Sequence, residues 1–382
     1  MTTRQLLSTF ALFPSFAVFA SEEPSSLNLT KGVTEISAQV YDLHMTILYI
    51  CVAIGVVVFG VMFWSIIHHR KSKGAVAANF HESTKVEILW TLIPFLILIG
   101  MAVPATRVLL AMEDVSEPEI TVQVTGSQWK WHYRYFDQDV EFFSLLASSA
   151  AQINGELAKR DNYLLEVDRP LVLPIGKKVR FLITSEDVIH SWWVPDFAVK
   201  KDANPGFINE AWTKIDKPGI YRGQCAELCG KDHGFMPIVV IAKPVEEFDA
   251  WVLETAAAQA KVREEEKKLL DMNMDMDELM ALGEEVYNSR CAACHQVNGL
   301  GLPGVFPALA QSDISINPDR IVDHLSVVIH GQDGTAMQAF GAQLGLKELA
   351  AVVTYERNAW GNNTGDAIQA AQVNAVLNGD DL

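Results

Sequence analysis

Cysteine is scarce in this sequence, with only five among 382 residues. Cys51 stands alone in an apolar stretch, where a small packed hydrophobic side chain is the ordinary role of cysteine. The other four form two close pairs, Cys225 with Cys229 and Cys291 with Cys294. No cysteine is left over for a disulfide framework, so the fold must be stabilised by its core and by the groups that these pairs bind.

Basic residues are few relative to acidic ones. The chain has 30 Lys+Arg against 47 Asp+Glu and a formal net charge of −17, which argues against nucleic acid as a partner. The imbalance is steepest from Glu246 onward, with 8 Lys+Arg against 22 Asp+Glu. An acidic part of this kind suits the attraction of a basic protein partner, and it is equally compatible with an ordinary solvated domain.

Charged side chains are absent from two long runs. Residues 45–67 and 88–106 contain no Asp, Glu, Lys or Arg. Each run is long enough to cross a hydrocarbon core of about 30 Å as a helix. Pro94 and Pro104 are tolerated in a membrane helix that packs against neighbours. We therefore expect a transmembrane helical hairpin within residues 40–112.

The flanking charges predict how this hairpin is oriented. The loop between the runs carries Arg70, Lys71, Lys73 and Lys85, whereas the segment after the second run is acidic. The positive-inside rule places the loop in the cytoplasm and both ends of the chain on the periplasmic or outer face of a bacterial inner membrane. Residues 1–20 have a single charge and an apolar stretch, which predicts a signal peptide; a membrane-lying N-terminus is the alternative.

Five side chains that bind metals crowd into twelve positions. The run CAELCGKDHGFM contains Cys225, Glu227, Cys229, His233 and Met236. Two thiols, an imidazole and a thioether suit a soft transition metal, above all copper. Because two thiolates can bridge two ions, we favour a dinuclear copper site. A disulfide, a zinc site and a mononuclear copper site remain alternatives.

The cluster lies in a β-rich region that we assign to residues 115–245. Short apolar runs separated by turn residues predict a sandwich or barrel. The expected strands include TVQVT, WKWHYRYF, YLLEV, LVLP, VRFLIT and PIVVIA. The metal-binding run then forms a loop between two late strands. His190, at the end of the apolar stretch VRFLITSEDVIH, is the leading candidate for a further ligand from the sheet; a buried core histidine is the alternative.

A second motif follows downstream. Cys291-Ala-Ala-Cys294-His295 is the pattern for covalent attachment of a c-type haem, with His295 as the proximal iron ligand. We expect an all-α haem domain over residues 278–360 that begins with a helix in LMALGEEVYNSR. Residues 246–277 are charged and predict a helical, solvated linker. Residues 361–382 predict a polar, mobile tail.

Residues 40–245 resemble subunit II of the haem–copper cytochrome oxidases. The matching stretches include VEILWTLIP, SQWKWHYRYF, VIHSWWVPDFAVKKDANPGF and YRGQCAELCGKDHGFMPIVV, in the order found in that family. The resemblance implies a cupredoxin-like Greek-key barrel that holds the dinuclear CuA centre. By position, it implies these copper ligands: His190, Cys225, Cys229, His233, Met236 and the main-chain oxygen of Glu227.

The same resemblance implies roles for three other side chains. The carboxylate of Glu227 matches a residue that reaches magnesium at the interface with subunit I. Trp129 matches the tryptophan through which electrons enter, and alternation places it on one strand face with Trp131, Tyr133 and Tyr135. Glu87 matches a carboxylate at the mouth of a proton path. A solvated loop acid, an aromatic packing face and a membrane-surface acid are the respective alternatives.

Residues 278–360 resemble a class I cytochrome c. The stretch GLGLPGVFPALA matches the loop in which a proline carbonyl, here that of Pro307, orients the proximal histidine. HGQDGTAMQAFGAQL places Met337 at the position of the sixth iron ligand, although Gln338 follows it where the family often has proline. His330 is the local rival ligand.

Together these resemblances imply subunit II of an oxygen-reducing, proton-translocating terminal oxidase with a fused cytochrome c domain. Its implied partners are oxidase subunits I and III and a soluble cytochrome c or similar donor. A nitric-oxide reductase subunit with the same copper centre is the alternative function. A copper-delivery or electron-carrier protein acting alone is a third hypothesis, and it predicts no stable association with a large membrane subunit.

Overall fold

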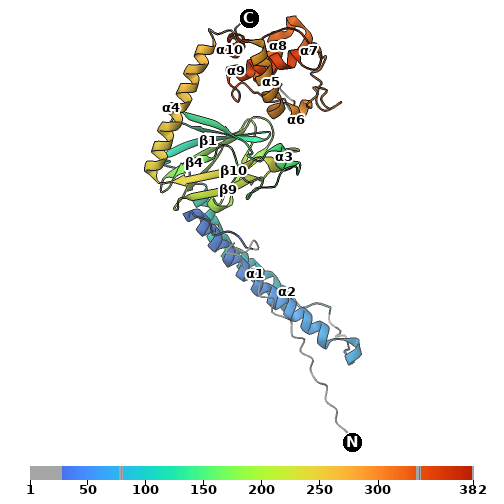
Figure 1. Cartoon of the computed structure of the whole chain (residues 1–382). Coiled ribbons are helices and arrows are strands. Elements are labelled where there is room, and N and C mark those ends of the chain that lie inside the picture. The colour runs from blue at the N-terminus through green and yellow to red at the C-terminus, as the bar shows by residue number, and fades with distance from the viewer. Residues whose placement is uncertain (1–27, 77–78, 80, 333–334, 336, 381–382) are drawn as a thin grey trace.

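The computed structural model describes residues 28–76, 79, 81–332, 335 and 337–380, and the predicted signal peptide lies outside this range. The described chain forms a helical hairpin, a β domain and a helical domain, arranged in that order along one axis (Figure 1). This arrangement confirms the multi-domain fold class expected from the sequence.

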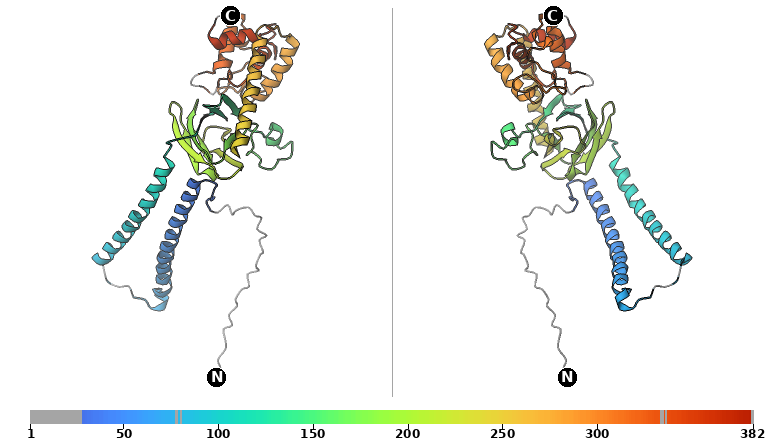
Figure 2. Two further views of the ribbon diagram at one scale, coloured as in Figure 1. Left: turned by 90° about the vertical axis from the view of Figure 1, so that its left-hand side faces the viewer. Right: turned by 90° about the vertical axis from the view of Figure 1, so that its right-hand side faces the viewer.

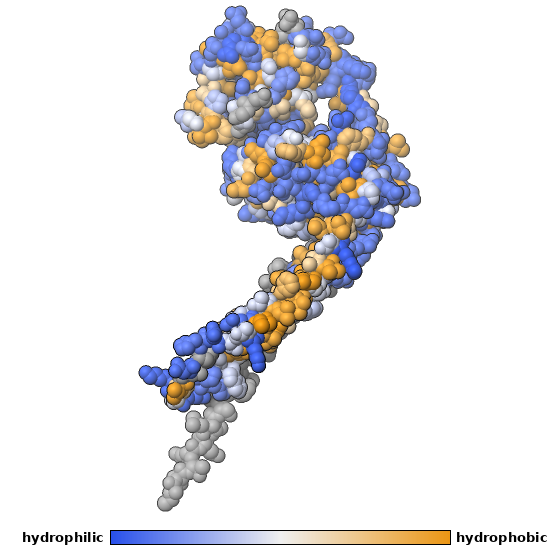
Figure 3. All heavy atoms as spheres, turned by 180° about the vertical axis from the view of Figure 1, so that it is seen from behind, coloured by the Kyte–Doolittle hydropathy of each residue, from blue (hydrophilic) through white to orange (hydrophobic). Residues whose placement is uncertain are grey.

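The hairpin consists of two long helices, α1 (Glu35–His68) and α2 (Thr84–Met112), joined by a segment that contains the short helix η1 (Lys71–Lys73). Both helices are long and apolar enough to cross a membrane, and they contain the predicted spans 45–67 and 88–106. Figure 2 shows the helices diverging away from the β domain, and Figure 3 shows apolar residues along them.

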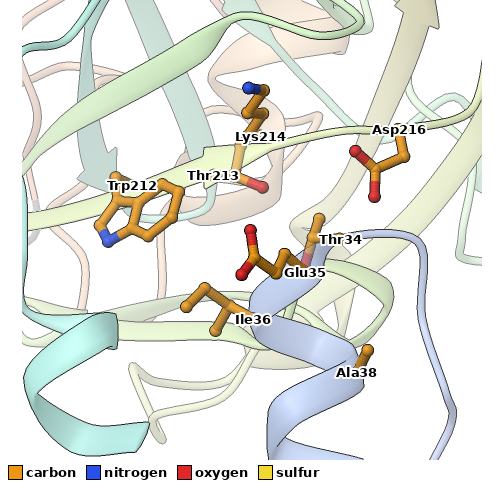
Figure 4. Close-up of a pocket in the computed structure, with 8 residues that line it drawn as sticks. All are labelled: Thr34, Glu35, Ile36, Ala38, Trp212, Thr213, Lys214 and Asp216. Carbon is orange, nitrogen blue, oxygen red and sulfur yellow. The ribbon is translucent and has the colours of Figure 1, made fainter.

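Both helices are fixed to the β domain at its base. Thr34 caps α1 and also donates to the carbonyl of Phe197 at 3.3 Å. The indole of Trp212 donates to the carbonyl of Ala111, near the end of α2, at 3.1 Å. A cavity of about 350 Å³ lies at this junction, and it is lined by Glu35 and Ile36 of α1 and by Trp212 of β8 (Figure 4). The hairpin is therefore joined to the β domain through both of its helices.

The β domain packs two five-stranded sheets face to face. The first has the order β3-β2-β1-β5-β8 and the second β4-β10-β9-β6-β7. The strands of the first sheet are β1 (Ile120–Ser127), β2 (Lys130–Tyr135), β3 (Val140–Ser144), β5 (Lys178–Ser185) and β8 (Asn209–Lys214). Those of the second are β4 (Leu171–Pro174), β6 (His190–Val194), β7 (Val199–Ala203), β9 (Gly219–Cys225) and β10 (Pro237–Lys243).

The core between the sheets follows from alternating burial. Along β5, the odd-numbered residues Val179, Phe181 and Ile183 are buried, and the intervening residues are partly exposed. One expected strand is absent: YLLEV forms turns, and only Val167 makes an isolated bridge, to Leu146. Short helices in the connections are α3 (Ala150–Ile153), η2 (Pro195–Phe197) and η3 (His233–Phe235).

The predicted linker is a helix that packs on the β domain. α4 (Val245–Leu269) starts directly after β10. Phe248 is 3% exposed, and Trp251 packs beside Tyr135 and Phe142 with ring centroids 5.5 and 6.3 Å away. The expectation of a solvated linker is therefore wrong for the first turns of α4, because aromatic side chains fix it to the sheet.

The C-terminal domain gathers its helices around one apolar core. These helices are α5 (Met276–Arg290), α6 (Ala292–His295), α7 (Asp313–Ile316), η4 (Pro318–Arg320), α8 (Ile321–His330), α9 (Leu346–Asn358) and α10 (Ala370–Asn378). Gly283 of α5 lies against α9 so closely that an added Cβ would meet the carbonyl oxygen of Ala351 at 2.2 Å. The two longest helices of the domain therefore cross at this glycine.

The expectation of a mobile tail after residue 360 is wrong. Asn362 donates to the carbonyl of Glu356 at 2.6 Å, and α10 buries Ala370, Val373 and Val376 in the domain core. The spacing of these three residues places them on one face of the helix. α10 is therefore part of the domain.

Candidate copper and haem sites

The metal-binding loop connects two paired strands. β9 ends at Cys225, and β10 begins at Pro237, directly after Met236. The two strands are antiparallel neighbours, with Gln224 opposite Pro237. His190 is the first residue of β6, which pairs with β9 on its other side. Three adjacent strands of one sheet thus fix both ends of the loop and His190, the candidate ligand outside it.

The five candidate side chains come together where these three strands meet the loop. The Sγ atoms of Cys225 and Cys229 are 3.9 Å apart, and His190 Nδ1 lies 4.0 Å from Cys225 Sγ. Cys229 Sγ is 3.5 Å from His233 Nδ1 and 3.6 Å from Met236 Sδ. The loop therefore brings two sulfurs, two imidazoles and a thioether within reach of common metal ions.

This donor set fits copper better than the alternatives. Both cysteines are free thiols, and their separation of 3.9 Å is far longer than a disulfide bond of about 2.05 Å. Met236 is 1% exposed and lies inside the cluster, and a thioether is a ligand of copper rather than of zinc. A second thiol exceeds what a mononuclear blue-copper site uses.

The thiols influence each other's ionisation. The thiol of Cys229 donates toward Cys225, so the pKa of Cys225 falls and that of Cys229 rises. Cys225 is therefore the thiol that ionises more readily, and a thiolate is the form in which cysteine would bind a metal ion.

His190 is held by a side chain that the sequence reading missed. Its Nε2 lies 2.9 Å from a carboxylate oxygen of Asp187, which leaves Nδ1 toward Cys225. Burial lowers the pKa of His190, but the hydrogen bond to Asp187 and the neighbouring Cys225 raise it above its ordinary value overall. A carboxylate behind a ligating histidine fixes its orientation. The sequence feature that could have predicted this role is the position of Asp187, three residues before His190 in SEDVIH.

Gly126 leaves room for the same histidine. A Cβ at this position would come within 2.9 Å of the His190 ring. The ring is fully buried and fixed by Asp187, so it has little freedom to move away. Glycine at position 126 thus supports the candidate metal site, although it offers no side-chain ligand atom.

The main chain and the side chain of Glu227 have different surroundings. Its main-chain oxygen accepts from Cys225 Sγ at 3.4 Å, so it faces the metal cluster. The residue itself is exposed, as is Leu228 at 79%. The main-chain oxygen of Glu227, which the family resemblance implies as a copper ligand, therefore lies at the cluster. The carboxylate of the same residue lies at the surface.

The aromatic run divides into two parts. Trp131, Tyr133 and Tyr135 are at most 1% exposed in the core of the β domain, as an ordinary packing face predicts. Trp129 precedes β2 and is partly exposed, and its indole donates to the carbonyl of Cys229 at 3.2 Å. Trp131 donates to the carbonyl of Met236 at 3.1 Å. Two tryptophans therefore brace the metal-binding loop from the opposite sheet.

The C-terminal domain contains a cavity of about 350 Å³ around the second motif. Cys291, Cys294, His295 and Met337 all line it, together with apolar side chains such as Phe306 and Val352. Two thiols beside a histidine and a thioether in an apolar cavity fit a covalently attached haem with two axial ligands.

The axial candidates are distinguished by position. His295 Nδ1 lies 2.9 Å from the carbonyl oxygen of Pro307, which leaves Nε2 as the nitrogen for iron. Met337 lines the cavity, whereas His330 is exposed at the end of α8 and does not line it. The geometry thus favours Met337 over His330 as the partner of His295.

Gln338 connects the two sites. Its side-chain nitrogen donates to the carbonyl of Gln128, and its oxygen accepts from Lys130 Nζ. Gln128 in turn donates through Nε2 to the carbonyl of Cys229 at 2.7 Å. The segment after Met337 therefore contacts a residue that holds the metal-binding loop, and this contact was not predicted.

Glu87 lies far from these centres in the structure. It is exposed in the first turn of α2, next to the loop that joins the two long helices. The β domain meets the other end of α2. The structure therefore places this carboxylate at the opposite end of the hairpin from both candidate redox sites.

Comparison with known families divides the chain in the same way as its fold. Residues 22–108 match a family described as "Cytochrome C oxidase subunit II, transmembrane domain", and residues 120–243 match its "periplasmic domain". Residues 278–355 match a family described as "Cytochrome C oxidase, cbb3-type, subunit III".

Individual relatives cover the first two parts. The chain is 42% identical to a "Probable cytochrome c oxidase subunit 2" of Rickettsia bellii over 243 residues, which is 63% of this chain and 88% of the relative. It is 37% identical to a "Cytochrome c oxidase subunit 2" of Cyanidium caldarium, over 60% of this chain and 90% of the relative. A crystal structure of the periplasmic domain of subunit II from Bradyrhizobium japonicum is 42% identical, covers 38% of this chain and 98% of its own, and has a TM-score of 0.34.

Proposed function

Because the chain belongs to the cytochrome c oxidase subunit II family, we propose that it delivers electrons from its own c-type haem, through a dinuclear copper centre, to subunit I of a haem–copper oxidase. The chain is a membrane-anchored subunit with a periplasmic domain, and it adds a cytochrome c domain to that plan. Oxygen reduction belongs to subunit I, so this chain acts as an electron relay.

Six groups would hold the copper pair: His190, Cys225, Cys229, His233, Met236 and the main-chain oxygen of Glu227. When bound, a copper pair accepts and passes on one electron at a time. The ligands come from paired strands and a loop braced by Trp129 and Trp131. Ligands held this firmly resist displacement when the charge of the centre changes, which favours fast transfer.

Four groups would hold the haem in the C-terminal domain. Cys291 and Cys294 would form thioethers, and His295 and Met337 would be the axial ligands. The hydrogen bond of His295 to the Pro307 carbonyl fixes the ring and increases its basicity. A thioether as sixth ligand raises the haem potential and leaves no open position for small molecules.

The observation that carries the proposal is the contact through Gln338. One residue beyond Met337, its side chain bonds to the carbonyl of Gln128, and the Gln128 side chain bonds to the carbonyl of Cys229. Burial raises the pKa of the Cys294 thiol, one of the two proposed haem-attachment groups, and Lys231 and Asp232 of the metal-binding loop make smaller, opposite contributions. The haem-attachment edge and the copper ligands therefore face each other.

The tether strengthens this contact. α4 runs from the β domain to the haem domain, where the carboxylate of Glu266 accepts from the backbone of Leu346 at 3.1 Å. A linked donor reaches its acceptor at a high effective concentration without tight binding. Trp129 lies beside this contact, so we propose that it helps electrons to enter the copper centre from the haem.

Further parts of the proposal concern the membrane complex. We propose that the hairpin lies in the bacterial inner membrane, with both redox domains on the periplasmic side. The exposed Glu227 carboxylate would reach a magnesium ion at subunit I, and Glu87 would lie at the mouth of a proton path. Subunit III and a soluble cytochrome c or similar donor complete the predicted assembly, which couples electron transfer to proton translocation.

The test is the reaction of the purified complex. We expect it to consume oxygen when a one-electron donor reduces the haem, and we expect little consumption of nitric oxide. Nitric-oxide consumption without oxygen consumption would instead support a nitric-oxide reductase. Purification of the chain alone, with no large membrane subunit attached, would support an independent carrier and contradict the proposal.

A further inference from the structure

The haem cavity contains a buried polar pair that none of the proposed ligands uses. His324 of α8 and Glu356 of α9 both line the cavity, and His324 Nε2 lies 2.9 Å from Glu356 Oε2. Their side chains are 2% and 4% exposed. The neighbouring core positions Leu325, Val328, Val352 and Val353 are apolar.

A pair of this kind is not explained by stability alone. Burying a charged pair costs more desolvation energy than packing apolar side chains of similar size. The pair does link α8 to α9, but apolar contacts already connect these helices to the shared core. Buried titratable groups in a cofactor cavity are candidates for a functional role.

The hydrogen bonds distinguish the two ring nitrogens of His324. Glu356 faces Nε2 of His324, so this nitrogen donates to the carboxylate. Nδ1 of His324 is buried and has no hydrogen-bond partner among the described residues. A buried N–H without an acceptor is costly, and a neutral ring avoids it by leaving a lone pair on Nδ1. Nε2 is then the ring nitrogen bonded to Glu356, and Nδ1 is left with a buried lone pair that has no partner among the described residues.

Other charged groups near the pair are few. Arg290 lines the same cavity from the end of α5. Burial, with a smaller contribution from Glu356, raises the pKa of Tyr287 and of the Cys291 thiol, and this thiol no longer titrates once it forms a thioether. Arg357 is bonded to Asp366 and to two backbone carbonyls.

On α7, η4 and α8 itself, the other acidic and basic groups lie at the surface. Arg320 bonds to Asp313 and Asp323, each at 2.8 Å, and Asp319 is exposed. Within the cavity, His324 and Glu356 are therefore the buried acid–base pair, and Arg290 is the other charged group that lines it.

We propose that Nδ1 of His324 is a proton-binding site coupled to reduction of the haem. An external one-electron donor supplies the electron to the iron, and bulk water supplies the proton to Nδ1, so the net charge of the cavity is unchanged. The carboxylate of Glu356 stabilises the resulting imidazolium. Without the proton, the added electron and the carboxylate repel each other in a cavity of low dielectric constant.

The inference rests on the proposed haem site and predicts how its potential varies with pH. Where one proton accompanies one electron, the equilibrium constant for reduction changes tenfold per pH unit, which is about 59 mV. The potential should therefore fall as pH rises across part of the range from about pH 5 to 9, in which histidines titrate.

The experiment is a redox titration of the haem absorbance in the full-length chain at several pH values. We expect His324→Gln and Glu356→Gln to lose the pH dependence. Glu356→Gln should also raise the potential, because it removes a negative charge. Asp323→Asn is the matched control: it removes an exposed carboxylate next to His324 and should leave the pH dependence intact.

Two results would overturn the inference. One is a haem potential of the unmodified chain that does not vary with pH, and the other is a pH dependence that survives in His324→Gln. Nitrogen NMR of the unmodified protein gives an answer even if the variants do not fold. It should show neutral His324 in the oxidised protein and imidazolium in the reduced one, and a neutral ring in both would equally contradict the inference. Absence of covalent haem would be a different failure, that of the proposed function.

Discussion

The two candidate redox sites differ in how the chain gathers their residues. Five of the six groups proposed to bind copper lie within twelve consecutive residues, and the sixth is the first residue of β6, which pairs with β9. The proposed haem cavity instead collects side chains from Arg290 to Glu356, over the five helices α5 to α9 and two loops. One loop between two paired strands is enough to gather the proposed copper ligands, because the sheet holds both of its ends. The proposed haem site instead needs several helices to pack around the cofactor.

This difference has consequences for how each site responds to change. The copper ligands are positioned by strand pairing and by groups behind them, such as Asp187, Trp129 and Trp131. The haem cavity depends on the packing of the whole C-terminal domain, including α10. We therefore expect single substitutions to disable the copper site selectively, and we expect the haem site to be tuned more gradually.

The largest effect should come from Cys225→Ser. Loss of this proposed ligand should reduce the copper content from about two ions per chain to less than about one, because a hydroxyl is a poor copper ligand. Metal analysis measures this directly. Covalent haem, detected on a denaturing gel, should remain. Cys51→Ser is the matched control, and loss of haem together with copper in Cys225→Ser would contradict the independence of the two sites.

Gly126→Ala should weaken copper binding without removing a ligand. The added Cβ would press on the His190 ring, which Asp187 and its burial hold in place. Displacing a ligand's support typically lowers metal affinity by about 10- to 100-fold. Competition with a copper chelator provides the measurement. Gly234→Ala, in the same loop but with open space around it, should bind copper normally.

Gln338→Ala should slow electron transfer between the sites while both stay occupied. It removes the bonds to Gln128 and Lys130. Losing two hydrogen bonds of about 1 kcal/mol each should lower the ratio of docked to undocked haem domain about tenfold or more. The rate of haem oxidation by copper after rapid reduction reports this. Gln343→Ala, which loses only a bond within its own segment, should behave like the unmodified chain.

The smallest effect concerns pH. Lys130 is 3% exposed beneath Gln338 and Phe340, and its burial lowers its pKa to about 8. Undocking of the haem domain would return the ammonium to water and raise this pKa, so protonation favours undocking below about pH 8.

Docking should therefore strengthen as pH rises above 8, by less than the limit of about tenfold per pH unit set by one proton. The rate of transfer from haem to copper, measured between pH 7 and 9, should rise accordingly. Lys130→Met keeps the buried chain length without the charge, and it should remove this dependence. A rate that falls as pH rises would show that the charged form of Lys130 supports docking instead.

The sequence was sufficient to predict those sites and segments whose residues are contiguous in the chain. The copper loop, the haem-attachment motif and the two spans are contiguous patterns, and the fold class followed from them. The groups behind the ligands were harder to predict, because Gly126 meets His190, and Trp131 bonds to the metal-binding loop, from the opposite sheet. The Gln338 contact joins two domains, and His324 meets Glu356 over 32 positions of the chain. No local pattern encodes such pairs.

Two wrong expectations have the same origin. YLLEV has the composition of a strand, but only Val167 finds a partner, through a single bridge. Residues 361–382 read as a polar tail because α10 has just three buried apolar positions among small and amide side chains. In both cases the outcome depends on what the rest of the domain offers for packing, and local composition does not contain that information.

The most direct test of the electron relay is rapid reduction of the haem in the isolated chain loaded with copper. Absorbance of the haem and of the copper centre would be followed together, at several protein concentrations. The account predicts that the haem is reoxidised as the copper is reduced, at one common first-order rate that does not depend on protein concentration. A rate proportional to protein concentration, or a reduced haem beside a copper centre that stays oxidised, would contradict it.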